Sequence, residues 1–147
     1  MKKLFCVLLA LLMALSAVGC GKDSPTTETA NAESCDVDLT QLSSTMVYSE
    51  VYNMMTAPDD YRGKTVKMSG NFAIYQDQTT GQIYFACVIA DATACCSQGL
   101  EFVLEGDHTY PDDYPELNSV ITVTGVFDTY EENGNIYCQL IHAKMET

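Results

Sequence analysis

Alternation of apolar and polar side chains is the dominant pattern from residue 64 to the end of this 147-residue chain. A period of two places the apolar residues on one face of a strand. Val47, Val51 and Met54 instead recur at helical spacing before this region. We therefore expect a mainly β fold with one short N-terminal helix over residues 45–56. The expected strands cover residues 64–76, 83–89, 100–105, 120–130 and 136–144.

Glycines in the predicted strands indicate how the sheet curves. Gly70 and Gly125 lie in the middle of two of the strands, where glycine permits the sharp coiling of a small barrel. Asn133-Gly134 is a strong hairpin signal between the last two strands. The order of a strand with a central glycine, a hairpin, a third strand, a connecting loop and a final hairpin resembles the OB-fold. This resemblance implies a five-stranded OB-like Greek-key barrel within a domain over residues 41–147.

The N-terminus combines a basic pair with a short apolar run. Lys2 and Lys3 precede an uncharged stretch, residues 4–18, which is shorter than the roughly 20 apolar residues of a membrane span. The run ends in Ser-Ala-Val-Gly-Cys at residues 16–20, which resembles the lipobox of bacterial lipoproteins. The resemblance implies that residues 1–19 are a lipoprotein signal peptide and that Cys20 is lipidated. The alternative is an ordinary signal peptide whose cleavage falls near a cysteine.

Such a lipid would attach the protein to the extracytoplasmic face of the cell membrane, because paired acyl chains anchor firmly. Residues 21–34 are rich in Ser, Thr, Glu, Asn and Ala and contain no aromatic residue. A segment of this composition cannot bury enough apolar surface to order itself. We therefore expect residues 20–40 to comprise the lipidated cysteine and a flexible tether.

The chain is strongly acidic, with 20 Asp and Glu, seven Lys and Arg, and a formal net charge of −13 at pH 7. Removal of Lys2 and Lys3 with a signal peptide would make it more acidic still. Phosphate backbones and anionic lipid surfaces both require basic residues. We therefore predict no nucleic-acid partner and a membrane contact only through the lipid on Cys20.

Five cysteines remain once Cys6 and Cys20 are assigned to the signal peptide and the lipid. They are Cys35, Cys87, Cys95, Cys96 and Cys138. An odd number cannot be paired completely within one chain, although export permits disulfides. Three or four thiolates that converge with a carboxylate would suit zinc or another soft metal. The predicted ligands are Cys87, Asp91, Cys95, Cys96 and Cys138, although their spacing is not Cys-x-x-Cys.

A second resemblance concerns Cys87-Val88-Ile89-Ala90-Asp91-Ala92 followed by Gly99. This stretch is similar to a Cys-x-x-Ala-Asp-Ala…Gly pattern in uncharacterised bacterial OB-like domains associated with membrane permeases, some of which are linked to metal handling. The resemblance implies a transporter or permease as partner. The vicinal pair Cys95-Cys96 departs from the pattern, and no catalytic role is implied.

Two other interpretations of the cysteines remain open. Cys87 or Cys138 could form a disulfide with one of the vicinal pair, or both could be small buried hydrophobes, because both alternate with apolar residues. Redox catalysis is disfavoured, because residues 86–105 contain no Lys, Arg or His that would lower a thiol pKa. The chain contains no hydrolase, metalloprotease or phosphate-loop motif, so no enzyme is predicted.

We therefore expect a lipid-anchored extracytoplasmic binding module, metal-binding or associated with a metal transporter through its cysteine cluster. The alternative is a structural or interaction lipoprotein whose cysteines form disulfides or fill the core. Tyr84 and Tyr130 belong to a set of strand tyrosines that could stack on a sugar or a peptide. Tyrosines that partly cover a barrel are the more common case.

Overall fold

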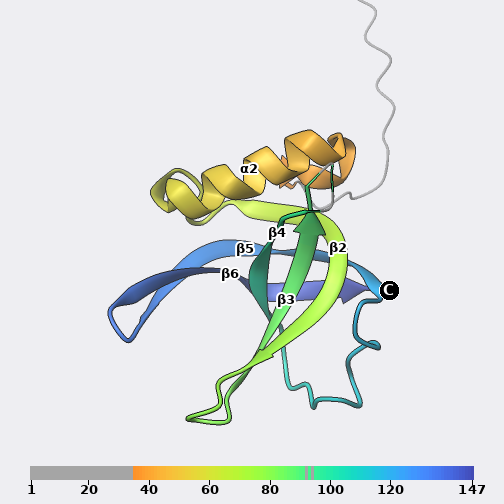
Figure 1. Cartoon of the computed structure of the whole chain (residues 1–147), viewed down its shortest axis with the longest axis vertical. Coiled ribbons are helices and arrows are strands. Elements are labelled where there is room, and N and C mark those ends of the chain that lie inside the picture. Colours follow the sequence, from red (N-terminus) through yellow and green to blue (C-terminus); the bar gives the residue numbers. More distant parts are fainter. Residues whose placement is uncertain (1–34, 92, 94) are drawn as a thin grey trace, which may run out of the picture. The chain divides into compact units, whose positions relative to one another are not determined.

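The computed structural model describes residues 35–91, 93 and 95–147. The predicted signal peptide, Cys20 and most of the predicted tether lie outside these residues. The described part is mainly β, with one α-helix before the long strands (Figure 1), as the alternation predicts. The elements are β1 (Val37–Asp38), the 3-10 helix η1 (Leu39–Gln41), α2 (Ser44–Thr56), the 3-10 helix η2 (Pro58–Asp60), β2 (Thr65–Gln76), β3 (Ile83–Ala90), β4 (Ser97–Leu104), β5 (Val120–Glu132) and β6 (Asn135–Glu146).

The strands form one sheet in the order β1-β2-β3-β4-β6-β5, and β2 also pairs with β5. β1 pairs with β2 and β4 with β6 in parallel, whereas the other neighbours are antiparallel. All five predicted strands are present. The hairpin prediction is also confirmed, because Asn133 and Gly134 both have positive φ, as a type I′ turn requires.

The sixth strand, β1, corrects two expectations. The sheet has six strands rather than five, and the ordered domain begins before residue 41. Val37 pairs with Val66, and Leu39 is buried in the core. A two-residue strand followed by one helical turn is too short to show the period of either a strand or a helix. The polar composition of residues 21–34 therefore led to the prediction that the tether extends to residue 40.

β2 exchanges one partner strand for another at its centre. Thr65–Asn71 pairs with β5, and Asn71–Gln76 pairs with β3. Gly70 lies at this exchange, where a Cβ atom would be 2.5 Å from the Val88 carbonyl oxygen. Glycine therefore permits the close approach of the β2 and β3 backbones that the exchange requires.

β6 also pairs with two strands, β4 and β5, and a β-bulge bends it. The register of β6 shifts against both β4 and β5 near Ala143, and His142 has a φ of 49°. A β-bulge bends its strand and increases the local twist. Gly125 on β5 faces this region, since a Cβ there would be 3.0 Å from the Ile141 carbonyl oxygen.

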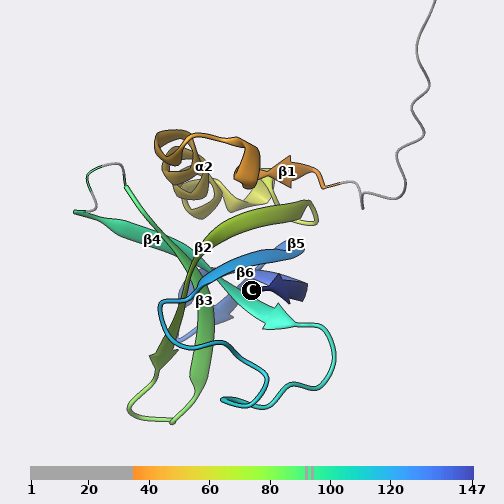
Figure 2. The same ribbon diagram turned by 90° about the vertical axis from the view of Figure 1, so that its right-hand side faces the viewer.

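The core lies between the curved strands and α2. Phe72, Phe102 and Phe127 are fully or almost fully buried, and Val51 and Met54 of α2 pack into the same cluster. α2 lies across one end of the strands, beside the β3–β4 turn (Figures 1 and 2). The β2–β3 turn and the connection between β4 and β5 lie at the opposite end (Figure 2). β3 and β4 therefore connect two separate ends of the domain.

We expect Gly70→Ala to lower the free energy of unfolding by about 1–3 kcal/mol, because the new methyl group would collide with the β3 backbone. Urea unfolding followed by circular dichroism measures this difference. The exposed neighbour provides the control: Asn71→Ala is expected to stay within about 0.5 kcal/mol of the parent. Equal stability of the two variants would show that the approach of β2 to β3 is not tight.

Candidate functional site

The turn between β3 and β4 brings three of the five predicted metal ligands together. Asp91 follows β3, and Cys95 and Cys96 precede β4. The Cys95 Sγ lies 3.2 Å from Asp91 Oδ2 and 3.5 Å from the Cys96 Sγ. One ligand atom from each residue falls within 4.8 Å of the others. We call Asp91, Cys95 and Cys96 the thiol cluster.

The carboxylate of Asp91 organises this turn. Its Oδ1 accepts hydrogen bonds from the backbone N–H groups of Thr93 (3.1 Å) and Cys95 (3.0 Å). The Asp91 N–H donates to the Cys96 carbonyl at 2.9 Å and closes the turn. Aspartate commonly holds turns in this way. Hydrogen bonds from the Cys95 thiol and from Thr93 lower the pKa of Asp91, so the group presents a charged carboxylate to the thiols.

Both cysteines of the thiol cluster are exposed to solvent. The hydrogen bond with Cys95 raises the pKa of the Cys96 thiol, and the negative charge of Asp91 acts in the same direction. This setting is opposite to that of a catalytic thiolate, which requires a nearby positive charge. A bound cation would supply that charge and favour the thiolate form that binds metals.

Cys87 and Cys138 do not join the thiol cluster. Cys87 is fully buried beside Gly70, and burial raises its pKa to about 12. Cys138 is half-buried on β6, where its Sγ lies 3.9 Å from the Met54 carbonyl oxygen of α2. Burial also raises the pKa of Cys138. The expected convergence of all four thiols is therefore wrong. Strand pairing places Cys87 in the core and Cys138 against α2, away from the thiol cluster. All five described cysteines are free.

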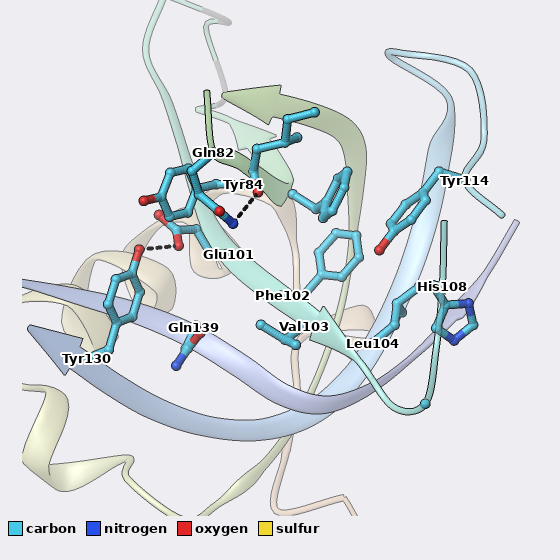
Figure 3. Close-up of a pocket in the computed structure, with 13 residues that line it drawn as sticks. Gln82, Tyr84, Glu101, Phe102, Val103, Leu104, His108, Tyr114, Tyr130 and Gln139 are labelled. Carbon is cyan, nitrogen blue, oxygen red and sulfur yellow. Dashed lines mark hydrogen bonds between the residues drawn. The ribbon is translucent and has the colours of Figure 1, made fainter. Parts of the chain in front are cut away.

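A groove of about 340 Å³ lies near the other end of β3 and β4 (Figure 3). Tyr84, Glu101 and Tyr130 lie at one end of it, and Phe102 and Tyr114 lie at the other (Figure 3). The first end is polar and acidic, whereas the second is aromatic. We call this feature the groove.

Two phenol–carboxylate hydrogen bonds define the polar end of the groove. The Tyr130 hydroxyl donates to Glu101 at 2.6 Å, and the Tyr84 hydroxyl donates to Glu132 at 2.8 Å. The bond to Glu132 raises the pKa of Tyr84 to about 12, and burial raises the pKa of Tyr130. Burial also raises the pKa of Glu101. Both phenols are therefore neutral donors at physiological pH.

The sequence pattern named Tyr84 and Tyr130 among strand tyrosines that could stack on a ligand, and it did not single out Glu101 or Tyr114. Tyr114 belongs to the polar connection after β4, and its ring stacks on Phe85 with centroids 4.1 Å apart. Two tyrosines, Tyr110 and Tyr114, in a loop that contains prolines were the available signal that this loop folds back on the sheet. Glu101 carried no signal, because it occupies an ordinary polar position of an alternating strand.

No protein-family model, curated protein or solved structure matches this chain. Among the residues that the structure describes, no helix has both the length and the apolar character needed to span a membrane.

The thiols should differ sharply in their reaction with iodoacetamide at pH 8. We expect Cys95 and Cys96 to be alkylated in the native protein. Cys87 should react only after unfolding, because burial both blocks access and raises its pKa to about 12. Mass spectrometry of peptides from native and urea-unfolded protein distinguishes these sites. Native labelling of Cys87 as fast as that of Cys95 would contradict its position in the core.

Proposed function

We propose that this protein is a lipid-anchored extracytoplasmic binding module that binds zinc or another soft metal at the thiol cluster. The observation that carries the proposal is the convergence of two exposed thiols and a charged carboxylate on one turn. Thiolates favour soft and borderline metals, and a carboxylate is a common third ligand of zinc.

The spacing of the donor atoms supports zinc. Two thiolates about 2.3 Å from a tetrahedral zinc ion lie about 3.8 Å apart, and a thiolate and a carboxylate oxygen lie about 3.5 Å apart. The corresponding distances here are 3.5 Å and 3.2 Å. These two pairs would each have to widen by about 0.3 Å, and the third pair, Cys96 and Asp91, lies within 4.8 Å. Three protein ligands leave a fourth position open, as in zinc sites that bind an exchangeable ligand.

We further propose that the domain is an OB-like barrel. Support comes from the pairing of β2 with both β3 and β5, which joins the two ends of the order β2-β3-β4-β6-β5. The parallel pairing of β4 with β6 supplies a Greek-key crossing of the kind found in the OB-fold. β1 and α2 are then additions to the barrel.

A transporter or permease remains the proposed partner. The stretch that resembles permease-associated domains forms the β3–β4 hairpin, which carries the thiol cluster at its exposed turn. Cys87 and Gly99 of that stretch have a packing role, since a Cβ at Gly99 would be 2.7 Å from the Cys87 carbonyl oxygen. Asp91 organises the turn. An exposed turn is accessible to a membrane partner that delivers or accepts metal.

The alternative function, a structural lipoprotein whose cysteines fill the core, accounts well for Cys87 and for half-buried Cys138. It does not account for two adjacent thiols exposed to solvent beside a carboxylate. The proposal therefore assigns packing to Cys87 and Cys138 and metal binding to Cys95 and Cys96.

We expect the full chain, purified in detergent without oxygen, to bind about one zinc ion. Cys95→Ser and Cys96→Ser should each weaken binding about 100-fold, because a hydroxyl replaces a thiolate ligand. As the pH is lowered, the apparent affinity should also fall about tenfold per pH unit for each thiol proton that zinc displaces. Because the pKa of Cys96 is raised, this dependence should persist at pH 8. Elemental mass spectrometry and competition with a chromogenic chelator measure both effects.

The matched control for these variants is Cys138→Ser, which removes a thiol outside the thiol cluster and should leave zinc stoichiometry unchanged. Retention of zinc by the Cys95→Ser/Cys96→Ser double variant would refute the metal site. Affinity independent of pH would show that the thiols are not the ligands.

The lipid anchor is tested at Cys20. In a bacterial host, Cys20→Ser should abolish incorporation of an alkyne-labelled fatty acid and move the protein out of the detergent phase, because the thiol that carries the lipid is lost. Cys35→Ser should keep both properties. A Cys20→Ser protein that still carries labelled lipid would show that another residue is modified.

A further inference from the structure

We propose that the groove binds a small organic cation, with an ammonium or guanidinium head attached to an aromatic or branched apolar body. This site is separate from the thiol cluster. Because strand residues rise about 3.3 Å each, Tyr84 in the groove and Asp91 lie about 23 Å apart along β3. The ligand, chemistry and position therefore all differ from those of the proposed metal site.

The acidic end of the groove carries negative charge. Glu101 is half-buried, and the charge of Glu132 adds to the burial that raises its pKa. The described residues that line the groove include no Lys or Arg. His108 is the sole imidazole among them, and its Nε2 lies 3.0 Å from the Glu105 carbonyl oxygen. A cation at this end would relieve the repulsion and offset the desolvation of Glu101.

The two tyrosines favour the same type of ligand. Tyr84 and Tyr130 flank Glu101 at this end of the groove (Figure 3). Their hydroxyl protons are already donated to Glu132 and Glu101, so the rings would meet a ligand mainly through their electron-rich faces. One face of Tyr130 is stacked on Tyr137, with ring centroids 5.3 Å apart, which leaves its other face for a ligand. Such faces attract ammonium and guanidinium groups. Phosphates and carboxylates are disfavoured by the same charge.

The other end of the groove requires an apolar body on the ligand. Leu104 and Tyr114 are partly exposed there, and Val103, next to Leu104 on β4, leaves 53% of its surface exposed. Tyr114 is stacked on Phe85, so this wall is formed before a ligand arrives. Preformed apolar grooves with a few polar groups at one end are typical of small-molecule sites. A hydrated metal ion would gain nothing from this surface.

The test uses 2-phenylethylammonium as the probe and the neutral 2-phenylethanol and anionic 3-phenylpropionate as matched comparisons. Each is titrated into the full chain, and binding is followed by amide chemical shifts. We expect the ammonium compound to bind with a Kd of about 1 mM or tighter. The amide shifts that it causes should map to Tyr84, Glu101 and Val103. 2-Phenylethanol should bind at least about fivefold more weakly, and 3-phenylpropionate should not bind.

Glu101→Gln should weaken the ammonium compound about fivefold or more while its amide spectrum shows an intact fold. Glu105→Gln removes the same charge just beyond β4, outside the groove, and should have no effect. Equal binding of the alcohol and the amine, or an undiminished affinity in Glu101→Gln, would overturn the proposal. Shifts in the groove with a neutral disaccharide but not with the amine would also overturn it.

The Cys95→Ser/Cys96→Ser double variant separates this proposal from the metal site. It should bind 2-phenylethylammonium with unchanged affinity, because the thiol cluster lies at the opposite end of β3. Loss of amine binding in this variant would show that the two sites are not independent.

Discussion

The close approach of β2 to β3 at Gly70 is the contact on which the rest of the domain depends. At this point β2 leaves β5 and begins to pair with β3, so one strand is paired with both β3 and β5. The absence of a side chain permits the approach, and the Cys87 thiol fills the space beside it. Because β3 is held here, the β3–β4 hairpin is placed with one end at α2 and the other at the β4–β5 connection.

Both candidate sites are consequences of that hairpin. The thiol cluster occupies its turn, where both thiols are exposed, and the groove lies near its other end, against a loop that returns to the sheet. The same arrangement places the cysteines of this hairpin in two different environments, one buried and one exposed. Cys87 faces the packed interior, where burial favours the neutral thiol, whereas Cys95 and Cys96 are exposed to solvent.

The sequence was informative wherever a local pattern decides the structure. Period-two alternation located five strands, Asn133-Gly134 located a hairpin, and the nearness of Asp91 to Cys95 and Cys96 in the chain brought the three together. Prediction failed where tertiary contacts decide. β1 is too short to show a period, and Cys138 was separated from the cluster by its packing under α2. Glu101 became a site residue only through its distant neighbours Tyr84 and Tyr130.

The acidity of the chain has different consequences at the two sites. A net charge of −13 raises the local concentration of any cation near the domain. At the metal site proposed for the thiol cluster, charge alone would not select a ligand, because a metal would have to displace protons from the thiols and its binding would therefore depend on pH. At the site proposed in the groove, selection would come from Glu101, the tyrosine faces and the apolar wall together. Salt would weaken the electrostatic part of this binding and leave the apolar part.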